Sequence, residues 1–380
     1  MNRESYGAAR IVASRVHAHF AHQQESNSGP RLEPLAQIPD AAIIEAIIDA
    51  AFWTSLRREE GFVPRISLAF VSPAESPGGL FFERPLALDP AALTRVAPAV
   101  ERPGIHLAVC GNHEDLTVWG VTRKIPAFCF VLEVAAPGLL VIKHSSGEES
   151  GKYINVAVLE GDQIKVVDER SSSAGDCPGL LTSLLGYGSP SSRAPSVNIM
   201  VELAVSMRAH GRGGILLVVP AGTDAWRESI LMPMPYLVAP PYSKLTRLSG
   251  DMPDDAEDRV VWREALDRAV NAVAGLTAVD GAVIITDQYE VLGFGAKIGR
   301  RKGSPRIEQV LVTEPIEGGA AELVHPDRLG NTRHLSAAQF VHDQRDAAAL
   351  VASQDGRFTF FQWSDCESMV HAHRLETLLL

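Results

Sequence analysis

Residues 211–220 read Gly-Arg-Gly-Gly-Ile-Leu-Leu-Val-Val-Pro and set the architecture of the second half of the chain. The continuous apolar run from Ile215 to Pro220 follows a glycine-rich turn, which predicts a strand buried on both faces. Before the turn, apolar residues recur at helical spacing over residues 196–210, and Ser196 can cap that helix. A helix that leads through a tight turn into a buried strand is typical of an α/β layer structure.

Helices and buried strands continue to alternate toward the C-terminus. We expect a helix over residues 256–274, a strand over Val283–Thr286 and a helix over His334–Asp346. Two further strands are expected over residues 347–352 and 357–362. This half is therefore predicted to be an α/β (α+β) domain, with a mixed β-sheet flanked by helices.

The first half has a different pattern, with one helix followed by many short strands. The helix is predicted over residues 41–60, where isoleucines recur with a period of about 3.6 residues. Runs separated by Gly, Pro, Asn or Asp predict strands at 66–71, 106–110, 116–122, 129–133, 139–143, 153–159 and 163–168. A stretch rich in Ser, Gly and Pro at 171–195 is the predicted linker. It would join an antiparallel β-rich domain at 1–170 to the α/β domain at 196–380.

Composition and charge narrow the classes of function. The chain has 380 residues, with 35 Lys and Arg against 46 Asp and Glu, so its formal net charge is −11. This acidic balance argues against a nucleic-acid or anionic-membrane partner, which needs clustered cations, but it leaves a small nucleotide ligand open. No signal sequence or membrane span is expected. The four cysteines are far apart in sequence, which disfavours a zinc ribbon and favours buried thiols in a cytoplasmic protein.

Two short motifs in the second half carry residues suited to metal and phosphate chemistry. Asp280-Gly281-Ala282 opens a buried strand, and a carboxylate beside glycine can hold a hard metal ion near the backbone, although an ordinary Asp-Gly turn has the same sequence. Residues 330–338 read Gly-Asn-Thr-Arg-His-Leu-Ser-Ala-Ala and enter a helix. Their N–H groups, hydroxyl, guanidinium and imidazole can cradle a phosphate, and the alternative is a helix cap with exposed charges.

Together these motifs resemble those of the diadenylate cyclase family, the catalytic domain of the DNA integrity scanning protein and its relatives. Members of that family carry Asp-Gly-Ala on a strand, then Gly-Thr-Arg-His-Arg-x-Ala entering a helix, then a strand that ends in Ser-Glu. The matching segments here are Asp280–Ala282, Thr332–Ala337 and Ser353–Gly356. Because Gly213–Val218 is also similar to an early strand of the family, the resemblance covers roughly residues 196–363.

The resemblance implies an activity and a set of site residues. The family condenses two ATP molecules into cyclic di-AMP and releases pyrophosphate, and its two-protomer site implies a homodimer or higher homo-oligomer. Asp280 would ligate Mg²⁺ or Mn²⁺, with Asp355 as the second candidate ligand, and would act in catalysis with Arg333 and His334. The nucleotide-binding residues that the resemblance implies are Gly281, Ala282, Thr332, Ser336 and Ser353.

Three positions depart from the family pattern. Leu335 stands where the family has its second arginine, Gln354 where it has glutamate, and Asn331 where it has glycine. The basic stretch 299–306 could supply replacement cations, or it could be a solvated loop. Two hypotheses follow: an active diadenylate cyclase, or a cyclase-type fold that binds a nucleotide as a sensor or scaffold.

The first half resembles DACNV, a predicted sensor domain that precedes some cyclase domains. The resemblance rests on the β-rich pattern, on the order of the domains and on the segment Leu116-Thr-Val-Trp-Gly120. It implies a regulatory input to the second half.

Five histidines occur in two short clusters without a matching carboxylate or cysteine, so we expect exposed side chains rather than metal ligands. They are His17, His19, His22, His371 and His373.

Overall fold

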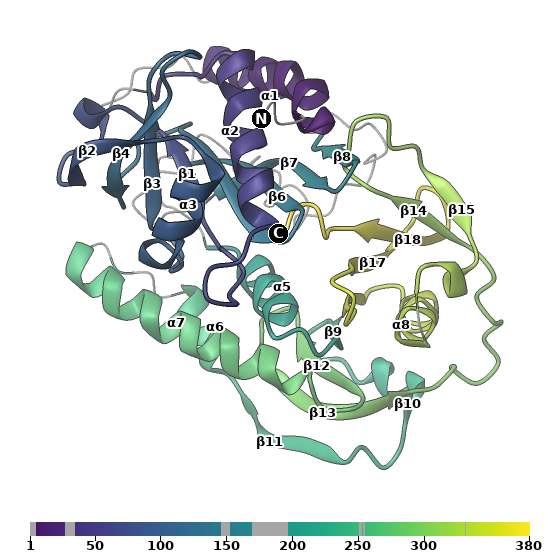
Figure 1. Cartoon of the computed structure of the whole chain (residues 1–380). Coiled ribbons are helices and arrows are strands. Elements are labelled where there is room, and N and C mark those ends of the chain that lie inside the picture. Colours follow the sequence, from purple (N-terminus) through teal and green to yellow (C-terminus); the bar gives the residue numbers. More distant parts are fainter. Residues whose placement is uncertain are drawn as a thin grey trace. The chain divides into compact units, whose positions relative to one another are not determined.

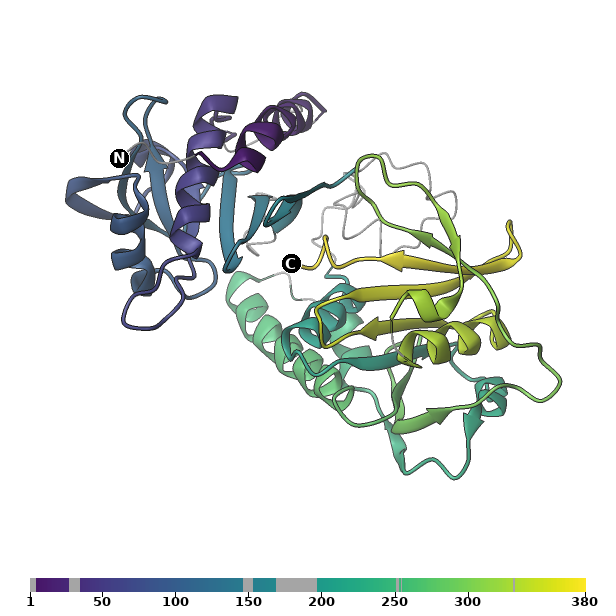
Figure 2. The same ribbon diagram turned by 45° about the vertical axis from the view of Figure 1, so that its right-hand side comes forward.

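The computed structural model of the chain describes residues 5–26, 35–145, 153–168, 197–250, 253, 255–330 and 332–380. The chain divides into two units, residues 1–168 with residue 380 and residues 169–379 (Figures 1 and 2), and each is described by itself. The predicted linker at 171–195 lies outside the described residues. Within the described ranges, no helix is long and apolar enough to cross a membrane.

The first unit is a sheet with helices packed against it. Its elements are α1 (Gly7–Ser26), α2 (Ala41–Ser55), β1 (Ser67–Phe70), β2 (Leu80–Ala87), α3 (Pro90–Val96), β3 (His106–Cys110), β4 (Thr117–Thr122), β5 (Phe130–Ala136), β6 (Leu139–Ser145), β7 (Tyr153–Glu160) and β8 (Gln163–Val166). The strand order is β2-β4-β3-β1-β5-β6-β7-β8. Neighbouring strands are antiparallel except β1 and β3, which are parallel, so the expectation of an antiparallel unit needs this one correction.

Helix α2 covers the sheet as its isoleucine pattern predicted. Ile44, Ile47 and Ile48 are fully buried and belong to one apolar cluster with strand residues such as Leu132. The helix α1 packs against α2, β7 and β8 but was not predicted. The residues of α1 that belong to the apolar cluster are alanines and valines together with Phe20. Because most of these side chains are small, the helical period of hydrophobicity is weak in the sequence.

The second unit contains the other sheet. Its elements are α5 (Ile199–Ala209), β9 (Gly214–Val219), β10 (Ile230–Leu231), β11 (Tyr236–Tyr242), α6 (Lys244–Gly250), α7 (Ala256–Leu276), β12 (Ala282–Thr286), β13 (Val291–Ile298), β14 (Val310–Thr313), β15 (Glu322–Val324), α8 (Thr332–Asp343), β16 (Ala348–Ala352), β17 (Phe358–Ser364) and β18 (Met369–Arg374). The strand order is β10-β13-β12-β9-β16-β17-β18-β14-β15, and β11 also pairs with β13.

This sheet is mixed and is covered on both faces, as the sequence predicted. β9 is parallel to β12 and antiparallel to β16. Ile215 and Leu217 pack in one cluster with Phe340 of α8, whereas the intervening Leu216 is fully buried outside that cluster. Figures 1 and 2 show α5 and α7 on the face opposite α8. Because alternate side chains of a strand point to opposite faces, the continuous apolar run of β9 fits a central strand.

The cap of helix α5 differs from the expectation. Asn198 is the N-cap, and its side chain accepts hydrogen bonds from the backbone N–H groups of Met200 and Val201. The expected cap, Ser196, lies outside the described residues. Asparagine suits this position because its short side chain reaches the unpaired N–H groups of the first turn.

Two expectations about exposure are wrong. His371 and His373 are 4% and 1% exposed, because β18 lies between β17 and β14 in the sheet. Cys129 is buried as expected, but Cys366 is exposed, because it lies in the turn between β17 and β18. Cys177 lies outside the described residues.

Candidate functional site

The strand register brings the sequence motifs to one edge of the second sheet. β9 and β12 are parallel, and β16 is antiparallel to β9 with Ala352 opposite Gly214. The segments that precede β9 and β12 therefore meet the segment that follows β16. Those segments carry Gly213, Asp280 and Ser353.

Arg333, in the first turn of α8, reaches the same edge. A Cβ atom added to Gly213 would lie 2.8 Å from Nη1 of Arg333 and 3.1 Å from the carbonyl oxygen of Ala352. Gly213 also has a φ of +70°, which strains residues that carry a Cβ. Glycine thus allows the guanidinium to lie against the backbone where β9 begins. We call the region around Gly213, Asp280, Arg333 and Ser353 the motif edge.

The carboxylate of Asp280 is exposed and has a cationic partner that the sequence did not reveal. Nζ of Lys297, on β13, lies 2.6 Å from Oδ2 of Asp280, whose side chain is 93% exposed. The hydrogen bond and charge of Lys297 lower the pKa of Asp280, and the charge of Arg333 adds to this effect. Asp280 is therefore ionised at neutral pH and interacts with both cations. Lys297 was missed because a single lysine in a glycine-rich run looks like an ordinary surface residue.

Gly281 and Ala282 shape the beginning of β12. Gly281 has a φ of +117°, and a Cβ atom there would lie 2.4 Å from the carbonyl carbon of Gly295 on β13. Ala282 is fully buried in the cluster that includes residues of α8. The methyl group of Ala282 therefore belongs to the core beneath the edge. Of the two residues, only the half-buried Gly281 has atoms that a nucleotide can reach, and these are backbone atoms.

His334 lies beneath the motif edge rather than on it. The residue is 0% exposed, and its ring lies edge-on to Phe361, with the ring centroids 6.2 Å apart. A Cβ atom on Gly330 would lie 2.6 Å from Nδ1, so glycine makes room for the imidazole. Within the described ranges neither ring nitrogen has a hydrogen-bond partner, and burial lowers the pKa of His334 to about 4. The imidazole is therefore neutral, and its predicted contact with a triphosphate would require the start of α8 to move.

The turn after β16 is held by its own polar contacts. Ser353 hydrogen-bonds to the carboxylate of Asp355 and lowers its pKa, and Asp355 also lies 3.4 Å from Nε of Arg357. Nε2 of Gln354 donates a hydrogen bond of 3.3 Å to the carbonyl oxygen of Arg212. A carboxylate cannot donate such a bond. Glutamine at position 354 therefore fastens this turn to the glycine turn before β9.

The remaining predicted residues lie along the first turns of α8. Thr332 is exposed and Ser336 is half-buried. Leu335 packs against the apolar cluster of the sheet, where an arginine would be partly desolvated. Asn331 lies outside the described residues.

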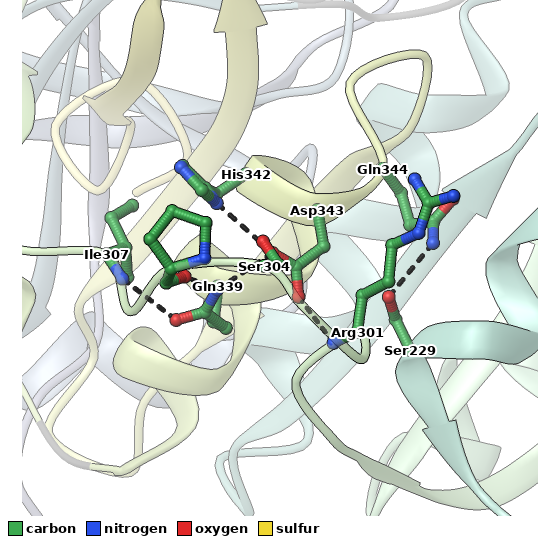
Figure 3. A network of polar contacts seen from close by, with 9 residues as sticks. Ser229, Arg301, Ser304, Ile307, Gln339, His342, Asp343 and Gln344 are labelled. Atoms are coloured by element: carbon green, nitrogen blue, oxygen red, sulfur yellow. Dashed lines mark hydrogen bonds and ion pairs between the residues drawn. The ribbon is translucent and has the colours of Figure 1, made fainter.

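Most of the basic loop, residues 299–306, lies at the end of α8 away from the motif edge. Its Arg301 N–H donates a hydrogen bond of 2.8 Å to Asp343, the last residue of α8 (Figure 3). Arg333 and Asp343 are ten positions apart, which corresponds to about 15 Å along a helix. Arg301 and the loop residues after it therefore lie with the other end of α8 and do not replace the missing arginine.

The carboxylates of the motif edge allow one limited kind of metal site. Across the part of the chain that the structure describes, no group of three or more His, Cys, Asp or Glu residues is arranged to hold a metal ion. Magnesium, however, often binds through one or two protein carboxylates together with substrate phosphates. The exposed Asp280 fits such a site if the cation replaces Lys297 as its partner.

Comparison with known proteins identifies part of the first unit. Residues 33–123 match the family model of the probable sensor domain DACNV. The first unit therefore contains a probable sensor domain, as the resemblance predicted. The matched stretch includes α2, α3 and β1–β4 and does not extend to the motif edge. A comparison with curated proteins found no match.

The first unit contains a relay, by which we mean a chain of hydrogen-bonded side chains: Ser67, His106 and Tyr153. The first two belong to the DACNV stretch. Nδ1 of His106 lies 2.7 Å from Oγ of Ser67, and Nε2 lies 2.7 Å from the hydroxyl of Tyr153. Burial lowers the pKa of His106 to about 4 and raises that of Tyr153 to about 12. All three side chains are therefore uncharged at neutral pH, so the relay joins β1, β3 and β7 without a buried charge.

Proposed function

We propose that the second unit binds ATP at the motif edge and condenses two ATP molecules into cyclic di-AMP or a related cyclic dinucleotide, under control of the sensor domain. One observation carries the proposal. An ionised, exposed carboxylate and two cations from three separate segments interact at one edge: Asp280, Lys297 and Arg333. This combination suits a metal–triphosphate ligand, because the carboxylate can bind the metal ion and the cations can bind the phosphate oxygens.

Each cation has a defined task in this proposal. The fork of Arg333 binds phosphate oxygens through two parallel hydrogen bonds. Lys297 exchanges its exposed carboxylate partner for a phosphate oxygen when ATP binds, and such exposed ion pairs contribute little to stability. Phosphoryl-type transfer depends mainly on positioning and charge neutralisation, which these two side chains provide.

The proposed reaction needs two copies of the chain. The ribose 3′-oxygen of each ATP forms a bond to the α-phosphorus of the other, and the bond between the α- and β-phosphates of each ATP breaks. Two pyrophosphates leave, and the two hydroxyl protons pass to water. Asp280 accepts a hydrogen bond from the attacking hydroxyl and orients it. Asp280, with Asp355 as the second ligand, would hold Mg²⁺ or Mn²⁺, which neutralises phosphate charge when bound. Because one edge holds one ATP, we infer a homodimer or higher homo-oligomer.

A second candidate function is nucleotide binding without turnover. It is favoured by the structural roles of Gln354 and Leu335, which stand where the cyclase family has charged residues. In this case the second unit would act as a nucleotide sensor or scaffold.

Incubation with ATP and Mn²⁺, followed by chromatography of the products, separates the two candidates. The cyclase proposal predicts a cyclic dinucleotide and a loss of about 100-fold in rate for Asp280→Asn, because the metal ion that would neutralise phosphate charge would lose its anionic ligand. A matched control is Asp267→Asn, which removes an exposed carboxylate 3.0 Å from Arg263 on α7 and should leave the rate unchanged.

Saturable ATP binding without a product would instead support the sensor or scaffold. Absence of both binding and product would overturn both candidates. Unchanged turnover in Asp280→Asn would remove Asp280 from the reaction.

A further inference from the structure

A cavity of about 670 Å³ lies at the C-terminal end of α8. Its walls come from three segments: residues between 219 and 226, residues 301–305 of the basic loop, and residues 342–347. Neither Asp280 nor Arg333 lines it. Small-molecule sites commonly have volumes of about 300–1,000 Å³, so the cavity has a suitable size for such a ligand.

Asp343 fixes the basic loop against α8 (Figure 3). Its side chain is 0% exposed and accepts hydrogen bonds from four donors: Arg301 N–H and Gln339 Nε2, both at 2.8 Å, His342 Nδ1 at 3.1 Å, and Ser304 Oγ. Burial alone would raise the pKa of Asp343, but these hydrogen bonds outweigh burial and lower it. The lining of the cavity therefore carries two carboxylates, Asp343 and Asp346, against the three cations Arg301, Lys302 and Arg345, which leaves a net charge of +1 (3 − 2).

Further hydrogen bonds hold the cavity walls together. Gln339 accepts from the N–H of Ile307 at 2.9 Å and donates to the carbonyl oxygen of Pro305 at 3.1 Å. Gln344 donates to Oγ of Ser229 at 2.9 Å and so joins the residues after α8 to the segment before β10 (Figure 3). Walls fixed in this way reduce the ordering cost of binding.

Three cationic side chains line the cavity: Arg301, Lys302 and Arg345. The guanidinium of Arg345 lies over the ring of Trp363, 4.0 Å from its centroid, and Trp363 itself does not line this cavity. Arg301 is 2.7 Å from Glu228, and both side chains are about half exposed. Such a pair contributes little to stability, so an anionic ligand can replace Glu228 at low cost.

We propose that this cavity binds a phosphorylated small molecule through Arg301, Lys302 and Arg345. Guanidinium groups match the geometry of phosphate oxygens and donate two hydrogen bonds at once. A hollow with fixed walls favours a small molecule over an acidic protein, which would need only a flat basic surface. The proposal concerns a site separate from the motif edge and holds whether or not ATP is turned over there.

The test is calorimetric titration of the full-length protein with inorganic pyrophosphate, repeated in an Arg333→Ala background so that the motif edge does not contribute. We expect saturable binding that weakens at least about tenfold in an Arg301→Ala, Lys302→Ala double variant, because charged hydrogen bonds to the ligand are lost. Arg300→Ala is the matched control and should bind normally, since Arg300 does not line the cavity. Glu228→Gln should bind more tightly, by about threefold, because the competing carboxylate is gone.

Several results would overturn the proposal. They are absence of saturable binding, loss of all binding on Arg333→Ala alone, or equal weakening by Arg300→Ala. Citrate binding as tightly as pyrophosphate would refute the assignment to phosphate. A dimer in sedimentation experiments that the double variant disrupts would show that the face contacts a second copy instead. ATP turnover in the double variant reports separately on the motif edge and should be unchanged.

Discussion

The carboxylates at the two ends of helix α8 differ in solvent exposure. Near its beginning, Arg333 interacts with Asp280, whose side chain is 93% exposed and has Lys297 as its hydrogen-bond partner. Its last residue, Asp343, is fully buried and accepts hydrogen bonds from four donors. The pKa is lowered at both residues, by Lys297 at Asp280 and by hydrogen bonds that overcome burial at Asp343.

The difference separates exchangeable contacts from structural ones. An exposed ion pair is screened by solvent, so a ligand or a metal ion can replace one partner at little cost. A buried carboxylate cannot lose its donors without leaving an uncompensated charge in the interior. We therefore expect ligand exchange at Asp280 and a structural role for Asp343, although both are aspartates beside basic residues.

The largest effect is expected from Asp343→Asn. The amide removes the charge and places an NH₂ group among donors, so buried N–H groups lose their acceptor at a cost of about 3 kcal/mol. The free energy of unfolding of the second unit can be measured in urea. Asp280→Asn is the matched control and should change this free energy by less than about 0.5 kcal/mol. Equal destabilisation by the two variants would abolish the contrast.

A pH effect of intermediate size is expected from His334. Its pKa in the folded protein is about 4, below its ordinary value of 6.5, because burial disfavours the charged form. The stability contributed by the neutral imidazole is therefore complete above pH 6.5 and is lost as the pH falls toward 4. When the pH falls from 7 to 5, one such group lowers the free energy of unfolding by about 2 kcal/mol.

The measurement compares urea unfolding of the wild type and of His334→Leu at the two pH values. Between pH 7 and pH 5, the free energy of unfolding of the variant should fall by about 2 kcal/mol less than that of the wild type. This difference does not depend on the stability of the variant at pH 7. The same pH dependence in both proteins would show that His334 is charged or exposed in solution.

The smallest effect is expected from Gly213→Ala, which tests whether the backbone at β9 places Arg333. The new methyl group would lie 2.8 Å from Nη1 of Arg333. We expect ATP to bind about tenfold more weakly, which is the loss of one charge-assisted hydrogen bond. Gly211→Ala is the control, because Gly211 also has a positive φ, +65°, but has nothing within 4 Å of the added Cβ. Equal weakening in both variants would mean that backbone strain, not Arg333, is responsible.

Helices α5, α7 and α8 and the central strands of the second unit could be predicted because their apolar pattern is strong, whereas the short helix α6 was not predicted. α7 and β12 match the sequence expectation closely, with α7 running two residues further. The strand β13 was missed because Gly293 and Gly295 interrupt its pattern, and β11 because it contains Pro240 and Pro241. β18 was missed because the buried faces of the strand include histidines, which sequence reasoning treats as exposed residues.

The site was predictable in its residue types but not in its arrangement. Asp280 and Arg333 were identified by their motif, and the structure brings them within electrostatic reach. Lys297 could not be identified, because its role depends on the pairing of β13 with β12. The burial of His334 was also not predictable, because it depends on Gly330 and on Phe361 of β17.

A β-rich unit with a DACNV stretch, an α/β unit, and the motifs at Asp280 and Arg333 can all be recognised in the amino-acid sequence. Periodicity and turn residues are local properties, so they can be recognised without coordinates. Which end of α8 each charged segment contacts depends on the folded chain. The basic loop lies with Asp343 and Lys297 lies with Asp280, because strand pairing and helix packing join residues that are far apart in the chain.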